Sequence, residues 1–183
     1  MADELIDILD NTGKPTGEVK LKSVAHQLGL YHASVHIWFY TKNGEILFQK
    51  RADIKDTFPG LWDVSVAGHI GTGETQIQSA LREIREEIGI SVTKNTLTFI
   101  GTYLAEKTPT PNIFDNEFHY IYISELTTPL SSLSMQKEEV SDLALLHIDT
   151  VTKIMKDPIY WKLYVPHDKQ YYALILKEIK NRL

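Results

Sequence analysis

The chain has 183 residues, of which 43% are hydrophobic and 23% are charged, and its formal net charge is −5. This composition is typical of a folded domain with a sizeable core and excludes an intrinsically disordered chain. The negative charge argues against a nucleic-acid partner, because phosphate backbones are bound by basic surfaces. The absence of cysteine excludes disulfides, thiolate metal sites and cysteine nucleophiles.

The amino-terminal sequence MADELIDILD is acidic and lacks the basic and apolar regions of a secretory signal. No apolar run approaches the length of about 18 residues that a membrane-spanning helix needs. We therefore expect a cytoplasmic protein without a membrane partner. The absence of repeats and long linkers predicts one domain over residues 1–183, with an N-terminal strand and helix extension over about 1–30.

The first half of the chain predicts short strands joined by turns. Residues 5–9 form an apolar run, and the glycines and proline of residues 10–17 suit a hairpin or a tight loop. Residues 18–28 predict a short helix. Residues 32–40 and 45–51 are rich in aromatic and β-branched side chains and flank a Lys-Asn-Gly turn, which predicts a hairpin of two strands. A further strand is expected at 63–67.

Residues 76–88 have the clearest helical pattern in the chain. Their apolar residues fall on one stripe at helical spacing, and Gly89 is suited to end the helix in the left-handed conformation. Strands are expected at 97–105 and 117–124, with a loop containing Thr-Pro-Thr-Pro between them. A loop and strand over 137–149, a short helix over 150–156 and a terminal helix over about 168–183 complete the expected elements.

Three glutamates, Glu83, Glu86 and Glu87, lie within about one turn of this helix. Like charges at this spacing repel by a few tenths of a kcal/mol per pair, or roughly 0.2–0.5 kcal/mol. Carboxylates beside the glycine-rich backbone of 68–73 offer the hard oxygen ligands that Mg²⁺ or Mn²⁺ prefers. The alternative is a solvated helix face, which is the usual meaning of a run of glutamates.

The stretch GHIGTGETQIQSALREIREEIGI, residues 68–90, resembles the signature of the Nudix hydrolases, G-x5-E-x7-R-E-U-x-E-E-x-G-U with U apolar. The resemblance implies the α+β Nudix fold, an α/β/α sandwich with a mixed sheet, and hydrolysis of a diphosphate linked to another moiety. It also implies a centre for Mg²⁺ or Mn²⁺ and a catalytic role for Glu83. The residues implied for the centre are Gly68, Glu83, Glu86 and Glu87, with Arg82 pairing with a glutamate of the signature and Glu74 supporting the loop.

A longer stretch, residues 32–69, is similar to the type 1 isopentenyl-diphosphate isomerases, a branch with the same fold. These enzymes bind a divalent metal through three histidines and two acidic residues. The resemblance implies a possible second metal site, although the gap between its first two histidines is one residue short. The matching positions are His26, His32, His69, Asp115 and Glu117, each histidine having the alternative of a purely structural role.

One position departs from the isomerases. Their catalytic cysteine precedes the glycine-histidine pair, and this chain has Ala67 there. An alanine methyl group cannot transfer a proton, so the acid-base pair of the isomerases lacks a member. The complete glutamate signature and the missing cysteine together favour hydrolysis.

We therefore predict a hydrolase dependent on Mg²⁺ or Mn²⁺ that acts on a small diphosphate, first a nucleoside diphosphate or its conjugate and second an isoprenoid diphosphate. Glu83 or Glu117 is expected to act as base, with Arg82 in the catalytic group. The alternatives are an isomerase with a substitute acid and a non-catalytic nucleotide-binding module. Oligomeric state is left open. The candidates for substrate binding are Lys50, Arg51 and Trp161, each with a surface or packing role as its alternative.

Overall fold

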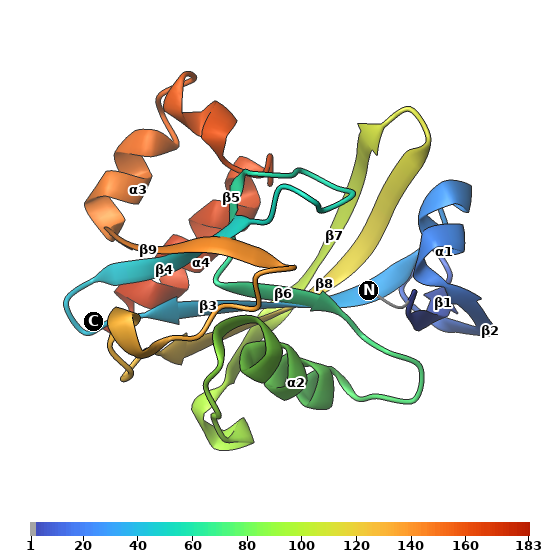
Figure 1. Cartoon of the computed structure of the whole chain (residues 1–183), viewed down its shortest axis with the longest axis horizontal. Coiled ribbons are helices and arrows are strands. Elements are labelled where there is room, and N and C mark those ends of the chain that lie inside the picture. The colour runs from blue at the N-terminus through green and yellow to red at the C-terminus, as the bar shows by residue number, and fades with distance from the viewer. Residues whose placement is uncertain (1–2) are drawn as a thin grey trace.

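The structure is a computed structural model that describes residues 3–183. Its central strand is β3 (His32–Tyr40), which pairs in parallel with β8 (Ile113–Glu125) along its whole length. On its other side β3 pairs with β6 (Val66–His69) near its start and meets β4 (Glu45–Arg51) near its end. The outer strands β5 (Trp62–Asp63), β7 (Thr98–Thr110) and β9 (Val140–His147) complete a mixed sheet of seven strands (Figure 1).

Helices cover both faces of this sheet (Figure 1). On one face Ile37 and Phe39 of β3 pack with Ile84 of α2 (Gln76–Ile88). On the other face Trp38 packs with Tyr171 of α4 (Lys169–Lys180), and α3 (Ile148–Ile154) joins the same cluster. Successive strand residues point to opposite faces, so the continuous apolar run of β3 serves two cores. The predicted α/β/α sandwich with a mixed sheet is confirmed.

A small N-terminal layer lies beside the main sheet. β1 (Leu5–Leu9) and β2 (Pro15–Leu21) form an antiparallel hairpin, and α1 (Lys22–Leu28) follows it directly. The helix predicted over 18–28 is therefore wrong for its first four residues, because the pairing of Leu5 with Leu21 extends the strand. Ile6 and Ile8 bury their side chains against Ala25 of α1. This packing fixes α1 close to the start of β3.

The hairpin of β7 and β8 is longer than expected. The Thr-Pro-Thr-Pro segment was predicted to be a loop, but β7 continues to Thr110 and β8 begins at Ile113. Pro109 is tolerated there because β7 is at the edge of the strand order, where an amide hydrogen is not needed for a second ladder. The extension pairs Lys107 with Asp115 and brings both toward the functional site.

The remaining predictions agree with the structure closely. The strands at 32–40 and 45–51 and the helix at 76–88 have the predicted bounds, whereas the strand expected at 63–67 is divided into β5 and β6. Short 3₁₀ helices occupy Lys94–Thr96, Leu130–Ser132 and Tyr160–Leu163. Within residues 3–183, none of the helices has both the length and the apolar character needed to cross a membrane.

The ends of α2 are defined by local chemistry. At its start the Thr75 hydroxyl accepts from the Gln78 amide, and the Gln78 side chain accepts from the Thr75 amide, which forms a capping box. At its end Gly89 has φ of 73°. A Cβ at Gly89 would lie 2.7 Å from the Cβ of Ser134 and 2.9 Å from its carbonyl oxygen. Gly89 thus permits both the left-handed turn and the close approach of the following chain.

The substitution Gly89→Ala is expected to lower the free energy of unfolding by about 1–3 kcal/mol, because it combines backbone strain with overlap at Ser134. Gly73→Ala is the matched control, since Gly73 has φ of 81° but no heavy atom within 4 Å of an added Cβ. Urea denaturation of both variants measures the difference. Equal losses of unfolding free energy in Gly89→Ala and Gly73→Ala would show that overlap with Ser134 contributes nothing to the loss.

Candidate functional site

A polar cavity of about 90 Å³ lies where β3, β6 and β8 meet α2. Both predicted metal groups contribute to its wall. Glu83 and Glu87 come from α2, and His26 comes from α1. The strands and their ends add Arg51, Gly68, His69, Asp115 and Glu117. Residues far apart in the sequence are therefore brought to one cavity.

Glu87 is the most deeply anchored carboxylate of α2. Its Oε2 accepts hydrogen bonds from the Gln49 side chain at 2.9 Å and from the Ala67 amide at 3.1 Å. Burial and then the nearby charge of Glu83 raise the pKa of Glu87 to about 8, and burial raises the pKa of Glu83 to about 7. Two adjacent buried carboxylates cannot both hold a negative charge at low cost unless a cation lies between them.

Gly68 has a packing role in this arrangement. A Cβ at this position would overlap the carboxyl group of Glu83. Only glycine therefore allows the Glu83 side chain to lie against the β6 backbone. The first glycine of the signature thus fixes where this carboxylate enters the cavity.

Arg82 connects the other acidic residues of the signature. Its guanidinium donates to Glu74 at 3.0 Å, to Glu83 at 2.7 Å and to Glu86 at 3.1 Å. It also donates to the carbonyl oxygen of His69 at 3.1 Å. Such a multiply bonded guanidinium holds the loop after β6 against the start of α2. Glu86 is 48% exposed and lies outside the cavity wall formed by the described residues, unlike Glu83 and Glu87.

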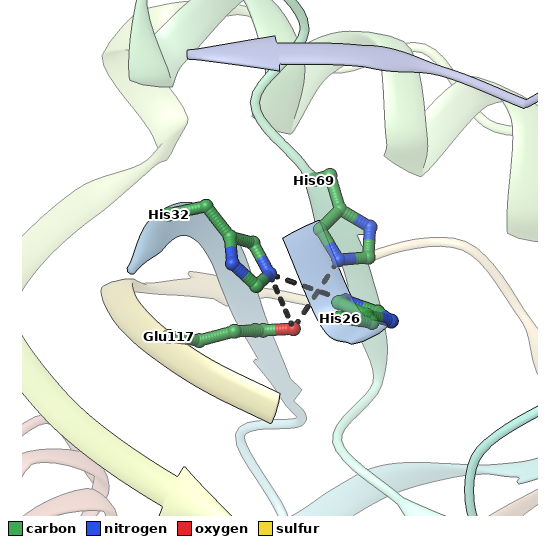
Figure 2. A group of neighbouring side chains, drawn as sticks. All are labelled: His26, His32, His69 and Glu117. Atoms are coloured by element: carbon green, nitrogen blue, oxygen red, sulfur yellow. Dashed lines mark hydrogen bonds and ion pairs between the residues drawn. The ribbon is translucent and has the colours of Figure 1, made fainter. Parts of the chain in front are cut away.

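The second group is a cluster of three histidines around Glu117 (Figure 2). The Nε2 atoms of His26 and His32 are 3.2 Å apart. Glu117 Oε1 lies 3.2 Å from His69 Nε2 and 3.6 Å from His32 Nε2. Asp115 Oδ1 lies 3.8 Å from His26 Nε2. The structure therefore brings together all five residues that the isomerase resemblance indicated.

The electrostatics of this cluster fit a cation. His69 Nε2 and Asp115 Oδ1 are buried without a hydrogen-bond partner among the described residues. Burial lowers the pKa of His26 to about 3 and raises the pKa of Asp115 well above its ordinary value. His32 Nδ1 lies 2.9 Å from the Leu30 carbonyl oxygen, so it donates there and leaves Nε2 with a free lone pair. Converging lone pairs and unpaired buried atoms are the environment of a metal ligand set.

Three cavity residues were missed from the sequence although a signal for them exists. Ser34 and His36 continue the alternation that begins at His32, and His119 continues the alternation of Asp115 and Glu117. Alternate strand residues share one face, so both sets point to the same side of the sheet. Ser34 Oγ lies 2.7 Å from His119 Nδ1, which is also 3.1 Å from Glu117 Oε2. The period of two along these strands is the signal by which these positions could have been found.

A second missed group links the C-terminal segment to Arg51. Asp63 is buried and accepts from Arg51 Nη1 at 3.0 Å and from His167 Nε2 at 2.8 Å. Burial opposes its charge, but the His167 hydrogen bond and the His167 and Arg51 charges hold the pKa of Asp63 well below its ordinary value. His167 Nδ1 lies 3.0 Å from Lys107 Nζ. No local sequence pattern connects these four residues, since they lie on four separate segments.

Two of the predicted substrate-binding residues lie outside this cavity. Trp161 is outside the cavity wall formed by the described residues, and its ring packs 5.9 Å from Tyr164 and 4.9 Å from Tyr172. Lys50 also lies outside that wall, whereas the next residue, Arg51, is part of it. Alternation along β4 explains this difference. Val165 and His167 are the residues by which the C-terminal segment reaches the cavity.

A family model described as the NUDIX domain matches residues 30–165 of this chain. This chain belongs to the Nudix hydrolase family. The Nudix hydrolase 3 of Arabidopsis thaliana is 36% identical over 174 residues, which are 92% of this chain but 22% of that protein. An uncharacterized Nudix hydrolase of Clostridium acetobutylicum is 33% identical over 99% of both chains. The enzymatic class expected from the signature is thereby confirmed.

The relatives also include the isomerase branch. An isopentenyl-diphosphate delta-isomerase of Salmonella heidelberg is 31% identical over 84% of this Nudix chain and 82% of that protein. Among solved structures, DR0079 of Deinococcus radiodurans has a TM-score of 0.64 at 20% identity and covers 88% of this chain and 100% of that one. The Salmonella isomerase confirms the expected resemblance to the isomerase branch. The structure of DR0079 supports the fold.

The substitution Gly68→Ala is expected to displace the Glu83 carboxyl group and to weaken Mn²⁺ binding by about 10- to 100-fold, because the ligand loses its support. Manganese binding followed by electron paramagnetic resonance measures the effect. Gly73→Ala, where an added Cβ has open space, is the control. Unchanged affinity in Gly68→Ala would contradict the role given to this glycine.

A pH-dependent contribution to stability is expected from His167. Burial and then the Lys107 charge lower its pKa from 6.5 to about 4, so between these values the unfolded chain binds a proton that the folded chain does not. The stabilising effect of neutral His167 is present above pH 6.5 and is lost as the pH falls toward 4. As the pH falls from 6.5 toward 4, the free energy of unfolding of the wild type should thus approach that of His167→Gln by about 1 kcal/mol per pH unit. Denaturant titrations at several pH values measure it, and a constant difference would contradict the assignment.

Proposed function

We propose that this Nudix hydrolase depends on Mg²⁺ or Mn²⁺ and cleaves the diphosphate bond of a nucleoside diphosphate or a nucleoside diphosphate conjugate. The observation that carries the proposal is that carboxylates of α2 and members of the histidine cluster around Glu117 line one cavity. One group is formed by carboxylates of α2, and the other is centred on Glu117. A diphosphate has enough negative charge to bridge cations at both places.

The first cation would be held by Glu83 and Glu87, with the backbone of Gly68 beside them and Glu86 on the outer side. Oxygen ligands of this kind suit Mg²⁺ and Mn²⁺. The second would be held by the histidine cluster described above, which also suits Mn²⁺ or another transition metal. When bound, such ions neutralise phosphate charge and lower the pKa of coordinated water.

The chain's own cations would orient the phosphates. Lys22, Arg51 and Lys55 line both the cavity and the pocket outside it. Arg51 is held by Asp63 and by the carbonyl oxygen of Thr57 at 2.9 Å, so its position is set before substrate binds. Preorganised cations lower the cost of binding a charged group.

In this proposal one of two carboxylates, Glu83 or Glu117, accepts a proton from the attacking water. Glu83 is held in place by Arg82 at 2.7 Å. Glu117 lies between the histidine cluster and His119, which keeps its orientation fixed. In this proposal Arg82 is a positioning residue, because its contacts are with the glutamates and the His69 carbonyl oxygen.

The isomerase alternative is disfavoured by the chemistry of the cavity wall. Ala67 lies in the wall beside Glu87 and carries no exchangeable side-chain proton. An allylic isomerisation needs one group to add a proton and another to remove one. A non-catalytic module is disfavoured because a binding role has no need for the complete set of glutamates.

The Glu87→Gln variant is expected to lose turnover by about 100-fold or more, since it removes a buried negative charge where a cation would bind. Glu86→Gln is the matched control and should lose less, because Glu86 is exposed. Product release is measured with nucleoside diphosphates, their conjugates and isopentenyl diphosphate in Mg²⁺ or Mn²⁺. Retained turnover in Glu87→Gln would disprove the proposed centre.

A further inference from the structure

Gln49 of β4 is a polar side chain in an otherwise apolar part of its strand. The three residues before it, Ile46, Leu47 and Phe48, are at most 1% exposed, and Gln49 itself is 2% exposed. Its backbone lies between β5 and β9 in the sheet. Burial of an amide without a hydrogen bond costs about 1–3 kcal/mol, so a glutamine at this position needs a polar partner.

The partner of Gln49 is Glu87, on the helix that covers this face of the sheet. Gln49 lies two residues after Leu47, which packs in the core cluster of α2, and alternate strand residues share a face. Its Nε2 donates to Glu87 Oε2 at 2.9 Å. Among the described residues, Glu87 is the one to which the Gln49 side chain is hydrogen-bonded. The polar side chain at this position therefore serves Glu87.

Two donors address the same oxygen of Glu87. The second is the Ala67 amide of β6, which donates to Oε2 at 3.1 Å. A carboxylate oxygen has two lone pairs, so Gln49 and Ala67 together occupy Oε2. The other oxygen, Oε1, accepts no hydrogen bond from the residues that the structure describes. Glu87 is thus left with one oxygen that can act as a ligand.

The other carboxylate of the proposed centre is also engaged through one oxygen. Glu83 Oε1 accepts from Arg82 at 2.7 Å, and this is the oxygen that a Cβ at Gly68 would overlap. The Arg82 contact leaves Glu83 Oε2 as its less occupied oxygen. The two glutamates therefore favour one ligand oxygen from each side chain over ligation through both oxygens of one carboxylate.

We infer that Gln49 makes the α2 centre selective for Mg²⁺ or Mn²⁺ over Ca²⁺, by restricting Glu87 to a single ligand oxygen. This inference rests on the proposed function, which assigns a cation to Glu83 and Glu87. Gln49 acts through Glu87 and is therefore a positioning residue.

The different demands of the cations give the physical reason. Mg²⁺ requires near-octahedral ligation, retains several waters and takes few protein oxygens, whereas Ca²⁺ takes more oxygens and accepts carboxylates through both of theirs. Loss of the Gln49 donor releases one lone pair of Glu87 Oε2, which favours Ca²⁺. It also removes a hydrogen bond that orients the carboxylate, which weakens Mg²⁺ binding. Both changes shift the selectivity toward Ca²⁺.

The selectivity is tested by displacing bound Mn²⁺ with Mg²⁺ or with Ca²⁺ and following the released Mn²⁺ by electron paramagnetic resonance. Both competitors prefer oxygen ligands, so the Mn²⁺ that they displace comes from the carboxylates of α2 and not from the histidine cluster. Glu87→Gln should lack this displaceable Mn²⁺. In Gln49→Met the ratio of the Ca²⁺ to the Mg²⁺ dissociation constant is expected to fall by about 10-fold, within the usual effect of a hydrogen bond to a metal ligand.

Gln76→Met is the matched control, because it makes the same chemical change on α2 at an exposed position. Gln49→Leu is a second variant without the donor, and thermal unfolding verifies that each protein is folded. An unchanged ratio in both Gln49 variants, including an equal loss of affinity for the two ions, would overturn the inference while the proposed function stands. A wild type without displaceable Mn²⁺ would refute the proposed centre and the selectivity together.

Discussion

The parallel register of β3 and β8 is the constraint on which the functional site depends. It pairs His32 with Glu117 and Ser34 with His119. Because the side chains of both strands alternate with the same period, one face at this end of the pair is polar and the other belongs to the core. A shift by one residue would exchange these faces and bury the polar set in the apolar layer. The apolar residues later in β3 make that exchange costly, so the core protects the register of the site.

The carboxylates of α2 are the second part of the site, and their position depends on close backbone packing. The apolar side of α2 is held against the sheet by Ile84 and Ile88. Its acidic side then faces β6, where Gly68 leaves space for Glu83 and the Ala67 amide donates to Glu87. The hydrophobic stripe and the glycine therefore act together to place buried charges that would be unfavourable in isolation.

The cavity wall carries charges of both signs. Lys22, Arg51 and Lys55 line both the cavity and the outer pocket, whereas Lys107 lines the cavity alone. Carboxylates and histidines line the same cavity. In the proposed function, these cations would contact the phosphate groups of the substrate beside the proposed metal ligands. Arg51 and His167 both donate hydrogen bonds to the Asp63 carboxylate. Because Lys107 lies beside His167, these hydrogen bonds connect Arg51 with Lys107.

The amino-acid sequence by itself determined the elements with strong periodicity and the residues of the signature. The helix over 76–88 and the strands over 32–40 and 45–51 follow from local patterns, and the glutamates with Gly68 follow from the motif. Alternation along the strands also contained a usable signal for His36 and His119. These features are local, so neighbouring residues suffice to define them.

Only the tertiary structure decided which distant residues meet in the cavity. Lys107, Asp63 and His167 belong to β7, β5 and the segment before α4, and their contact depends on how these elements pack. The same packing removed Trp161 from the cavity, because its ring is used in the core. The strand β2 and the long edge strand β7 likewise depend on pairing partners that local propensity does not contain. Long-range pairing and burial are properties of the folded chain as a whole, which is why a single sequence without its fold could not provide them.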